Sequence, residues 1–226
     1  MDLKKEAAKK AVTFIQNGTA VGLGAGATMA YMVEYLHEKK EALDIRLYTS
    51  SGGTRVLLQQ CGFVVNDVSS VSHLNFYFDG CDQFDSNLNA LKSGGGIHTM
   101  EKLLASMADE FILVGDESKY TEHLGTKYPL VLEVLPQAVC FVSAKIKEHF
   151  TGSTTNIRRN SLTHQLITTE NGNHLLDILF SEPPEWERVN PVIKEITGVV
   201  ETSLFYNIAN KAIIAGEDGI RVITKP

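Results

Sequence analysis

Short runs of apolar residues recur along the first half of the chain, and each run ends in glycines or polar residues. Continuous apolar runs of this kind are typical of strands buried in a parallel sheet. They predict strands at 20–23, 45–48, 63–65, 74–79 and 111–115. The helical spacing of apolar residues between the runs predicts helices at 2–16, 29–40, 54–60 and 99–107. This alternation predicts the α/β class, with a doubly wound, mostly parallel and Rossmann-like sheet.

The pattern changes after Pro129. The second half predicts a strand at 130–134, a helix at 138–150, a hairpin of 163–169 with 174–180, and a helix from 183 to about 198. The hairpin prediction rests on Asn171-Gly172, because this dipeptide favours the tight turn of a two-stranded hairpin.

The changed pattern predicts a small α+β subdomain at 128–198, inserted into an α/β catalytic domain made of 1–127 and 199–226. The tail returns to the earlier pattern. Two apolar segments there, 211–215 and 220–224, flank Glu217-Asp218-Gly219. They predict a final hairpin.

Polar or glycine-rich segments follow the predicted strands. The carboxyl ends of parallel strands lie at one edge of a sheet, and open α/β sheets bind ligands at that edge. The segments expected there are 24–28, 49–53, 79–85, 92–96 and 116–119. A charged loop is commonly only solvated, but this many segments on one edge predict a binding site.

The residues with catalytic potential gather between Asp79 and Glu101. Asp79 ends an aromatic strand, and Lys92 ends a short apolar run. Gly94–Gly96 follow, and Thr99 is predicted to cap a helix with Glu101 in its first turn. Backbone N–H groups at a helix start suit an anion or a developing oxyanion, and a carboxylate with a raised pKa can act as a base. Each feature alone is as often a turn or a helix-dipole partner, but together they favour a catalytic site.

Composition argues against several classes of protein. The net charge is -6 and no basic stripe is present, which argues against a nucleic-acid partner. No apolar run approaches the roughly 18 residues of a membrane span, so no membrane partner is expected. The three cysteines lie far apart and the histidines show no ligand spacing, so we expect no metal site and no disulfide framework. The N-terminus does not resemble a signal peptide, and a cytoplasmic protein is expected.

The first glycine turn does not have the spacing of a dinucleotide site. Its glycines are Gly22, Gly24 and Gly26, so the G-x-G-x-x-G pattern is absent. The next predicted strand leads into 49–53, which holds hydroxyls and glycines. Nicotinamide-binding folds usually have an acidic residue there for the ribose. We expect a phosphate or sugar at this edge and no NAD.

Several motifs together carry a family resemblance. They are the glycine loop 22–28, the acid pair Asp79 and Asp82, Lys92 with its glycines, Glu101-Lys102, the segment 116–119, and the landmarks 129–134 and 198–205. With them the chain resembles the A-type family of ribose-5-phosphate isomerases over essentially its whole length. The resemblance implies the two-part α/β and α+β fold, no metal or organic cofactor, and a homodimer or homotetramer.

The resemblance also implies a reaction, the interconversion of D-ribose 5-phosphate and D-ribulose 5-phosphate in the pentose phosphate pathway. Glu101 would move the proton between C1 and C2, and Asp79 would assist ring opening. Asp82 and Lys92 would bind and polarise substrate oxygens. The implied substrate-binding residues are Gly24, Gly26, Thr28, Ser50, Ser51, Gly94, Gly95, Gly96 and Lys119.

The chain departs from the family pattern at Ala27, Gln83, Ser93 and Met100, where the family often has Ser, Glu, Gly and Arg. None of these changes removes a group implied to be catalytic. They leave open altered efficiency or a paralogue with a shifted sugar-phosphate preference. Two further alternatives are a non-catalytic sugar-phosphate sensor and a transferase with a glutamate nucleophile. Retention of the acid pair with Lys92 argues against the transferase.

Overall fold

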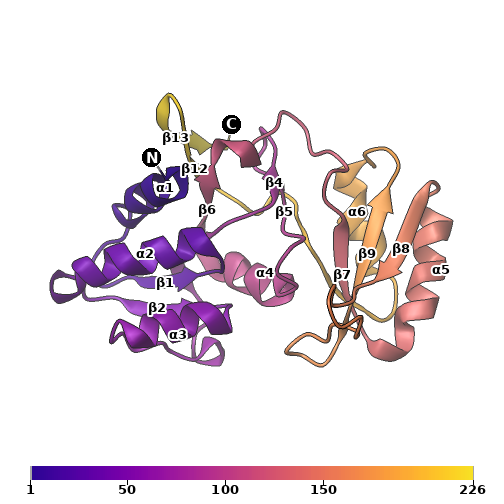
Figure 1. Ribbon diagram of the computed structural model, residues 1–226, viewed down its shortest axis with the longest axis horizontal. Coiled ribbons are helices and arrows are strands. Elements are labelled where there is room, and N and C mark those ends of the chain that lie inside the picture. Colours follow the sequence, from indigo (N-terminus) through magenta and orange to yellow (C-terminus); the bar gives the residue numbers. More distant parts are fainter. Residues whose placement is uncertain (1, 226) are drawn as a thin grey trace.

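The computed structural model describes residues 2–225, which form three sheets (Figure 1). The largest has the strand order β13-β12-β6-β3-β1-β2. Its strands are β1 (Ala20–Leu23), β2 (Arg46–Thr49), β3 (Leu74–Asp79), β6 (Ala108–Asp116), β12 (Lys211–Gly216) and β13 (Gly219–Thr224). All neighbours pair in parallel except β12 and β13, which form the predicted terminal hairpin. The expected mostly parallel sheet is confirmed.

Helices cover both faces of this sheet. They are α1 (Leu3–Val12), α2 (Ala27–Glu38), α3 (Gly52–Gln60) and α4 (His98–Met107). Successive side chains of a strand point to opposite faces. Phe78 therefore packs with α1 and α2, whereas Tyr77 packs with Leu104 of α4. The alternating helices and strands thus form a doubly wound sheet with helices on both faces.

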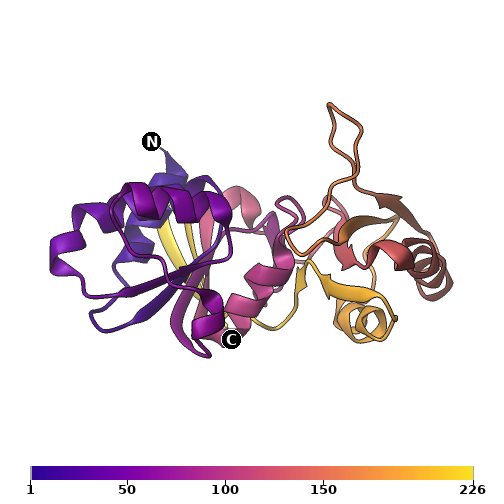
Figure 2. The same cartoon turned by 90° about the horizontal axis from the view of Figure 1, so that it is seen from below.

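A second sheet lies beside the first part of the molecule (Figure 2). It is antiparallel, with the order β10-β7-β9-β8. Its elements are β7 (Leu130–Val134), α5 (Val139–His149), β8 (Ser153–Ile157), β9 (His174–Phe180), α6 (Trp186–Lys194) and β10 (Val199–Thr202). Val142, Ile146 and Val189 of its helices are buried against the sheet. This is an α+β arrangement, and the boundaries of the two domains stay a prediction.

A small third sheet connects the two parts. It contains β4 (Gln83–Phe84), β5 (Ala90–Leu91) and β11 (Leu204–Phe205), in the order β11-β5-β4. Because β11 follows β10 almost directly, it ties the second sheet to the segment that carries Lys92. The ring of Phe205 packs 5.8 Å from that of Phe111, in the core of the first part.

Two strand predictions were wrong. Segment 63–65 is no strand: Val65 makes a single bridge to Leu47, and Val64 is 79% exposed. Segment 163–169 is not the main partner of β9, which pairs with β7 and with the polar strand β8. Asn171-Gly172 does make a tight turn, but it supports only one isolated bridge, between Thr168 and His174.

Helix ends differ modestly from the sequence expectation. The first helix ends at Val12, short of the predicted residue 16, and the Thr13 hydroxyl donates to the Lys10 carbonyl. Asp2 caps its start by accepting the N–H groups of Lys4 and Lys5. No helix within residues 2–225 combines the length and apolar character that crossing a membrane requires.

Candidate active site

The strand order reverses between β1 and β3, and a glycine makes room for a carboxylate there. Open α/β sheets bind ligands at such a switch point. The Gly24 N–H donates to the Phe78 carbonyl at 2.9 Å, which brings the glycine turn against the end of β3. A Cβ on Gly24 would lie 1.9 Å from Cγ of Asp79. The absence of a side chain at Gly24 therefore leaves room for the Asp79 carboxylate.

Asp79 is 1% exposed and its carboxylate is surrounded by donors. Its Oδ1 accepts the N–H groups of Ala25 at 3.2 Å and Gly80 at 2.8 Å. Its Oδ2 accepts the Tyr77 hydroxyl at 2.7 Å and lies 2.8 Å from Nζ of Lys92. A buried charge needs such partners, and Asp79 has them.

Tyr77 links this carboxylate to the end of β2. Its hydroxyl lies 2.7 Å from Asp79 and 3.0 Å from the Ser50 hydroxyl. Burial, reinforced by the charges of Asp79 and Glu101, raises the pKa of Tyr77 well above its usual value, so the phenol remains a donor. Sequence reasoning treated Tyr77 as a core aromatic residue. Its position two residues before Asp79, on the opposite strand face from Phe78, was the available signal.

Lys92 lies at the centre of the cluster, with a side chain 6% exposed. Its Nζ donates to the Gly80 carbonyl at 2.5 Å and lies 3.4 Å from a carboxylate oxygen of Glu101. It also lies 5.8 Å from the ring centroid of Phe205. Burial alone would lower the pKa of Lys92, but Asp79 and Glu101 outweigh it and raise the pKa above the ordinary lysine value. The lysine is therefore a fixed cation.

Glu101 stands in the first turn of α4, as the sequence predicts, and is 5% exposed. Burial is the largest influence on this carboxyl. Lys92 opposes it and Asp79 adds to it, and together they raise the pKa of Glu101 to about 8. A carboxylate with this pKa can both take up and release a proton near neutral pH.

Asp82 anchors the glycine loop. Its Oδ2 accepts the N–H groups of Ser93 at 2.6 Å and Gly94 at 2.9 Å. The Gly94 amide is therefore already used inside the loop. The Gly95 N–H meets no acceptor among residues 2–225 and belongs to the cavity wall. Asp82 thus keeps this part of the loop in a fixed conformation beside Lys92.

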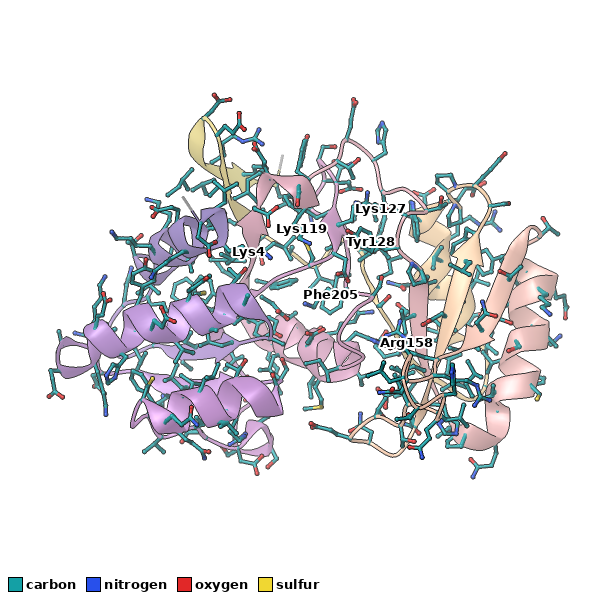
Figure 3. The ribbon with its side chains drawn as sticks, viewed as in Figure 1. Lys4, Lys119, Lys127, Tyr128, Arg158 and Phe205 are labelled. Carbon is teal, nitrogen blue, oxygen red and sulfur yellow. The ribbon has the colours of Figure 1, made fainter. Side chains whose placement is uncertain are left out.

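A cavity of about 240 Å³ opens over this cluster. Its lining includes Lys92, Glu101 and the start of α2. The residues that line it are Lys4, Ala25–Thr28, Gly80–Asp82, Lys92, Gly94, Gly95, Glu101, Val114–Asp116 and Lys119. Figure 3 labels Lys4 of α1 and Lys119 of the turn after β6, and both residues belong to the cavity lining. Lys4 was missed because nothing in its helical sequence shows that α1 reaches the cavity.

The remaining expected residues lie apart from this cavity. The Ser50 hydroxyl is bound to Tyr77, and the Ser51 hydroxyl caps α3 by accepting the Thr54 N–H at 3.2 Å. Gly96 has φ +69° and packs against the second sheet. The predicted cap at Thr99 was wrong, because α4 begins at His98 and the Thr99 hydroxyl donates to Glu133.

The cluster contains carboxylates and a lysine rather than a set of metal ligands. Within residues 2–225, no group of three or more His, Cys, Asp or Glu side chains has a geometry that could hold a metal ion. The charge opposite the carboxylates is supplied by Lys92, 2.8 Å from Asp79.

Comparisons with known proteins agree with this fold. The family model described as ribose 5-phosphate isomerase A (phosphoriboisomerase A) matches residues 46–219. A ribose-5-phosphate isomerase A from Rhodopseudomonas palustris is 33% identical over 99% of this chain and 98% of its own length. The structure of ribose 5-phosphate isomerase A from Methanocaldococcus jannaschii matches with a TM-score of 0.90 at 30% identity, over 98% of each chain. A D-ribose-5-phosphate isomerase solved in complex with phospho-erythronic acid matches with a TM-score of 0.92 at 30% identity, over 99% of this chain and 100% of that chain.

Proposed function

The chain belongs to the ribose 5-phosphate isomerase A family, and from this premise we propose that it interconverts D-ribose 5-phosphate and D-ribulose 5-phosphate. The cavity lining contains one group of residues suited to a phosphate and another group suited to proton transfer. We therefore place the phosphate of the substrate against the first group and its reacting carbons against the second. A matched relative was solved in complex with phospho-erythronic acid, which carries a phosphate as the substrate does and, in addition, a carboxylate.

The phosphate end is assigned to the start of α2. The first N–H groups of a helix have no partner within it and carry a partial positive charge, which attracts anions. Ala27 and Thr28 open α2 on the cavity wall, and Lys4 and Lys119 stand beside them. Two lysines and a helix start together supply the charge that a phosphate dianion requires.

The reacting carbons are assigned to the part of the cavity lined by Lys92 and Glu101. Glu101 removes the proton from C2 of the open-chain aldose. The electrons of that C–H bond form the C1=C2 double bond, and the π electrons of the C1 carbonyl move to O1. Lys92 stabilises the enediolate oxygens with its fixed charge, together with the exposed N–H of Gly95. Glu101 then returns the proton to C1, while a proton passes from O2 to O1, which completes the ketose.

Asp79 and Asp82 have supporting roles in this proposal. Asp79 lies behind Lys92 and holds its ammonium at 2.8 Å, so its part in ring opening acts through the lysine. Asp82 reaches the cavity wall and fixes the loop that carries Gly94 and Gly95. Gly24, by contrast, serves the substrate indirectly, by making room for Asp79.

Glu101 is the observation that carries the proposal. A surface glutamate would be ionised at neutral pH and too weak a base for a carbon acid. Burial on the cavity wall raises the pKa of Glu101 to about 8, which matches a base that must also give the proton back. The sensor alternative requires no buried carboxylate with a raised pKa.

The test is isomerisation of ribose 5-phosphate by the purified chain in D₂O. Product should form, and solvent deuterium should enter at C1 in part of it. Unphosphorylated ribose should react poorly, and phospho-erythronic acid should compete with the substrate. Absence of product and of carbon-bound deuterium would overturn the proposal.

A lysine series tests the phosphate end. Lys119→Ala should weaken substrate binding by about 2–4 kcal/mol, because a charged hydrogen bond in a partly closed site is lost. Lys127→Ala is the matched control, since Lys127 is exposed and lies outside the cavity. Equal Michaelis constants for the two variants would place the phosphate elsewhere.

Two further points belong to the same proposal. Assembly into a homodimer or homotetramer is supported by the family resemblance, and sedimentation of the purified chain measures it. A cytoplasmic location is supported by the three unpaired cysteines, Cys61, Cys81 and Cys140, since reducing compartments keep thiols free.

A further inference from the structure

The segment 158–173, between β8 and β9, projects from the second part of the molecule (Figure 2). Both of its ends lie close to the loop that leads from Lys92 to Glu101. Neither contact is expected from the sequence, because the two segments are far apart along the chain. Each end carries a different set of hydrogen bonds.

Arg158 forms the contact at the first end. Its guanidinium binds Asp177 of β9, with Nε 3.0 Å and Nη2 2.6 Å from Oδ1. The remaining Nη1 donates to the Gly94 carbonyl at 3.2 Å. Figure 3 shows Arg158 on the side of the second sheet that faces the first part. Arg158 therefore joins this sheet to the beginning of the glycine run.

Glu133 of β7 forms the contact at the other end. It is 1% exposed, and its Oε1 accepts from Thr169 at 2.9 Å, Asn171 at 3.0 Å and Asn173 at 2.8 Å. Its Oε2 accepts the hydroxyl of Thr99, two residues before Glu101. One carboxylate thus joins the end of the projecting segment to the first turn of α4.

The middle of the glycine run also touches the second sheet. Gly96 has φ +69°, and a Cβ there would lie 2.6 Å from Cδ1 of Leu175 in β9. The run is therefore held at Gly94 by Arg158, at Gly96 by packing, and just beyond it by Glu133 through Thr99. The opposite side of the loop is held by Asp82.

We propose that Glu133 and Arg158 are positioning residues, through which the second sheet fixes the Gly94–Thr99 loop and so sets the distance between Lys92 and Glu101. This inference rests on the proposed function, because it concerns the base and lysine of that reaction. Neither residue touches the reacting atoms. Glu133 acts through Thr99, and Arg158 acts through the Gly94 carbonyl.

The loop is short enough for such contacts to matter. Lys92 and Glu101 flank the Gly94–Thr99 loop, and Nζ of Lys92 lies 3.4 Å from a carboxylate oxygen of Glu101. A displacement of about 1 Å in a catalytic group can cost on the order of 100-fold in rate. Loosening either contact should therefore lower kcat without removing any catalytic group.

The test uses Thr99→Val and Arg158→Lys. The first keeps the shape of Thr99 and removes its hydrogen bond to Glu133. The second keeps the charge beside Asp177 and removes the second arm that reaches Gly94. Each should lower kcat by about 3- to 30-fold, with a smaller change in KM. Since the loop that buries Glu101 opens, the acid limb of the pH–kcat profile should also move to lower pH.

The matched controls make the same chemical changes elsewhere. Thr19→Val removes a hydroxyl that donates to the Gln16 carbonyl at 2.6 Å. Arg159→Lys alters the neighbouring arginine, which donates to His164 within the projecting segment. Both should keep the kcat and pH profile of the unaltered protein. Glu133→Gln should keep most of the activity, because its amide can bond the Thr99 hydroxyl and its oxygen can accept the other donors.

Amide hydrogen exchange of residues 94–100 separates this inference from the proposed function, because it needs no substrate. Thr99→Val and Arg158→Lys should speed exchange in this loop, whereas the controls should not. Lower melting temperatures with unchanged kcat, pH profile and loop exchange would overturn the inference and make the contacts merely structural. Faster loop exchange in a protein without isomerase activity would support the positioning role of Glu133 and Arg158 and contradict the proposed function.

Discussion

Two buried glutamates, Glu101 and Glu133, lie on either side of the start of α4 and have opposite chemistry. Glu101 is 5% exposed and Glu133 is 1% exposed, so both are shielded from solvent. Glu133 accepts hydrogen bonds from four side chains, those of Thr99, Thr169, Asn171 and Asn173. Glu101 has Lys92 at 3.4 Å, a cation that it shares with Asp79.

The pKa values of the two glutamates follow the balance between burial and the donors that reach each carboxylate. Burial would raise the pKa of Glu133, but the hydrogen bonds outweigh it and lower the pKa below the ordinary value. At Glu101 burial prevails, and the pKa rises to about 8. Donors that bind the charged form stabilise it, whereas burial without enough donors favours the neutral form. Glu133 is therefore an anion that holds structure, and Glu101 is the proposed base.

Replacing the base should have the largest effect. Glu101→Gln keeps the size of the side chain and removes proton transfer, so kcat should fall by about 10²–10⁴-fold. Binding of phospho-erythronic acid should persist, because Lys92 and the residues suited to a phosphate are intact. Kinetics and calorimetric titration measure the two properties. A variant with most of its turnover left would mean that Glu101 is not the base.

Replacing the structural glutamate should mainly cost stability. Glu133→Ala leaves buried donors from Thr169 and Asn173 without acceptors, which should lower the free energy of unfolding by about 2–4 kcal/mol. Urea denaturation measures this loss. The exposed Glu38→Gln is the control and should change stability by less than about 0.5 kcal/mol. An equally small effect of Glu133→Ala would erase the contrast between the two glutamates.

The sequence predicted that Glu101 lies in the first turn of a helix. It could not have predicted how the surroundings of Glu101 differ from those of Glu133. Glu101 follows a glycine run at a helix start, which is a local pattern. Glu133 lies within an apolar strand, and its donors come from residues 34 to 40 positions away. Local patterns likewise predicted the parallel sheet and the terminal hairpin, because strand and turn signals lie within a few residues.

The failures have the same physical origin. Thr99 looked like a helix cap, but tertiary contact with Glu133 competes for its hydroxyl. Segment 163–169 has hairpin spacing around Asn171-Gly172, yet β8 provides the longer pairing with β9. The sequence does not show that Lys4 and Tyr77 belong to the site, because this depends on where α1 and β3 lie in the fold. Contacts between distant segments decide these positions, and one sequence does not show them.

The activity should depend on pH through Glu101. The carboxylate is the active form of the base, and its pKa of about 8 means that it is mostly protonated at pH 6. The ratio kcat/KM for the unaltered protein should fall about tenfold for each pH unit below that pKa. Because any ordinary carboxylate is already ionised by pH 6, a flat profile between pH 6 and 8 would contradict the raised pKa.

The stability of the two glutamate variants should depend on pH with opposite signs. The raised pKa of Glu101 favours the folded state at low pH, and this contribution is lost as pH rises from 4.5 to about 8. Glu101→Gln should therefore melt higher than the unaltered protein above pH 8, by roughly 2–4 °C for each kcal/mol gained. The lowered pKa of Glu133 stabilises the folded state above its ordinary range and is lost in acid, so the deficit of Glu133→Gln should shrink there. Melting curves at several pH values measure both.

Tyr77→Phe, which changes a hydrogen bond to Asp79, should give the smallest effect. This change removes the hydroxyl that donates to Asp79 at 2.7 Å, while the ring stays packed against Phe111. The N–H groups of Ala25 and Gly80 still donate to the carboxylate, so Asp79 should keep its position. Its contact with Lys92 should become less rigid. The loss of one neutral hydrogen bond is worth about 1 kcal/mol, so kcat should fall about 3- to 10-fold with little change in KM. Ser50→Ala is the matched control: it removes the other partner of the Tyr77 hydroxyl and leaves the bond to Asp79, so kcat should change less. Equal losses in the two variants would show that the whole chain from Ser50 to Asp79, rather than the donor to Asp79 alone, holds the lysine.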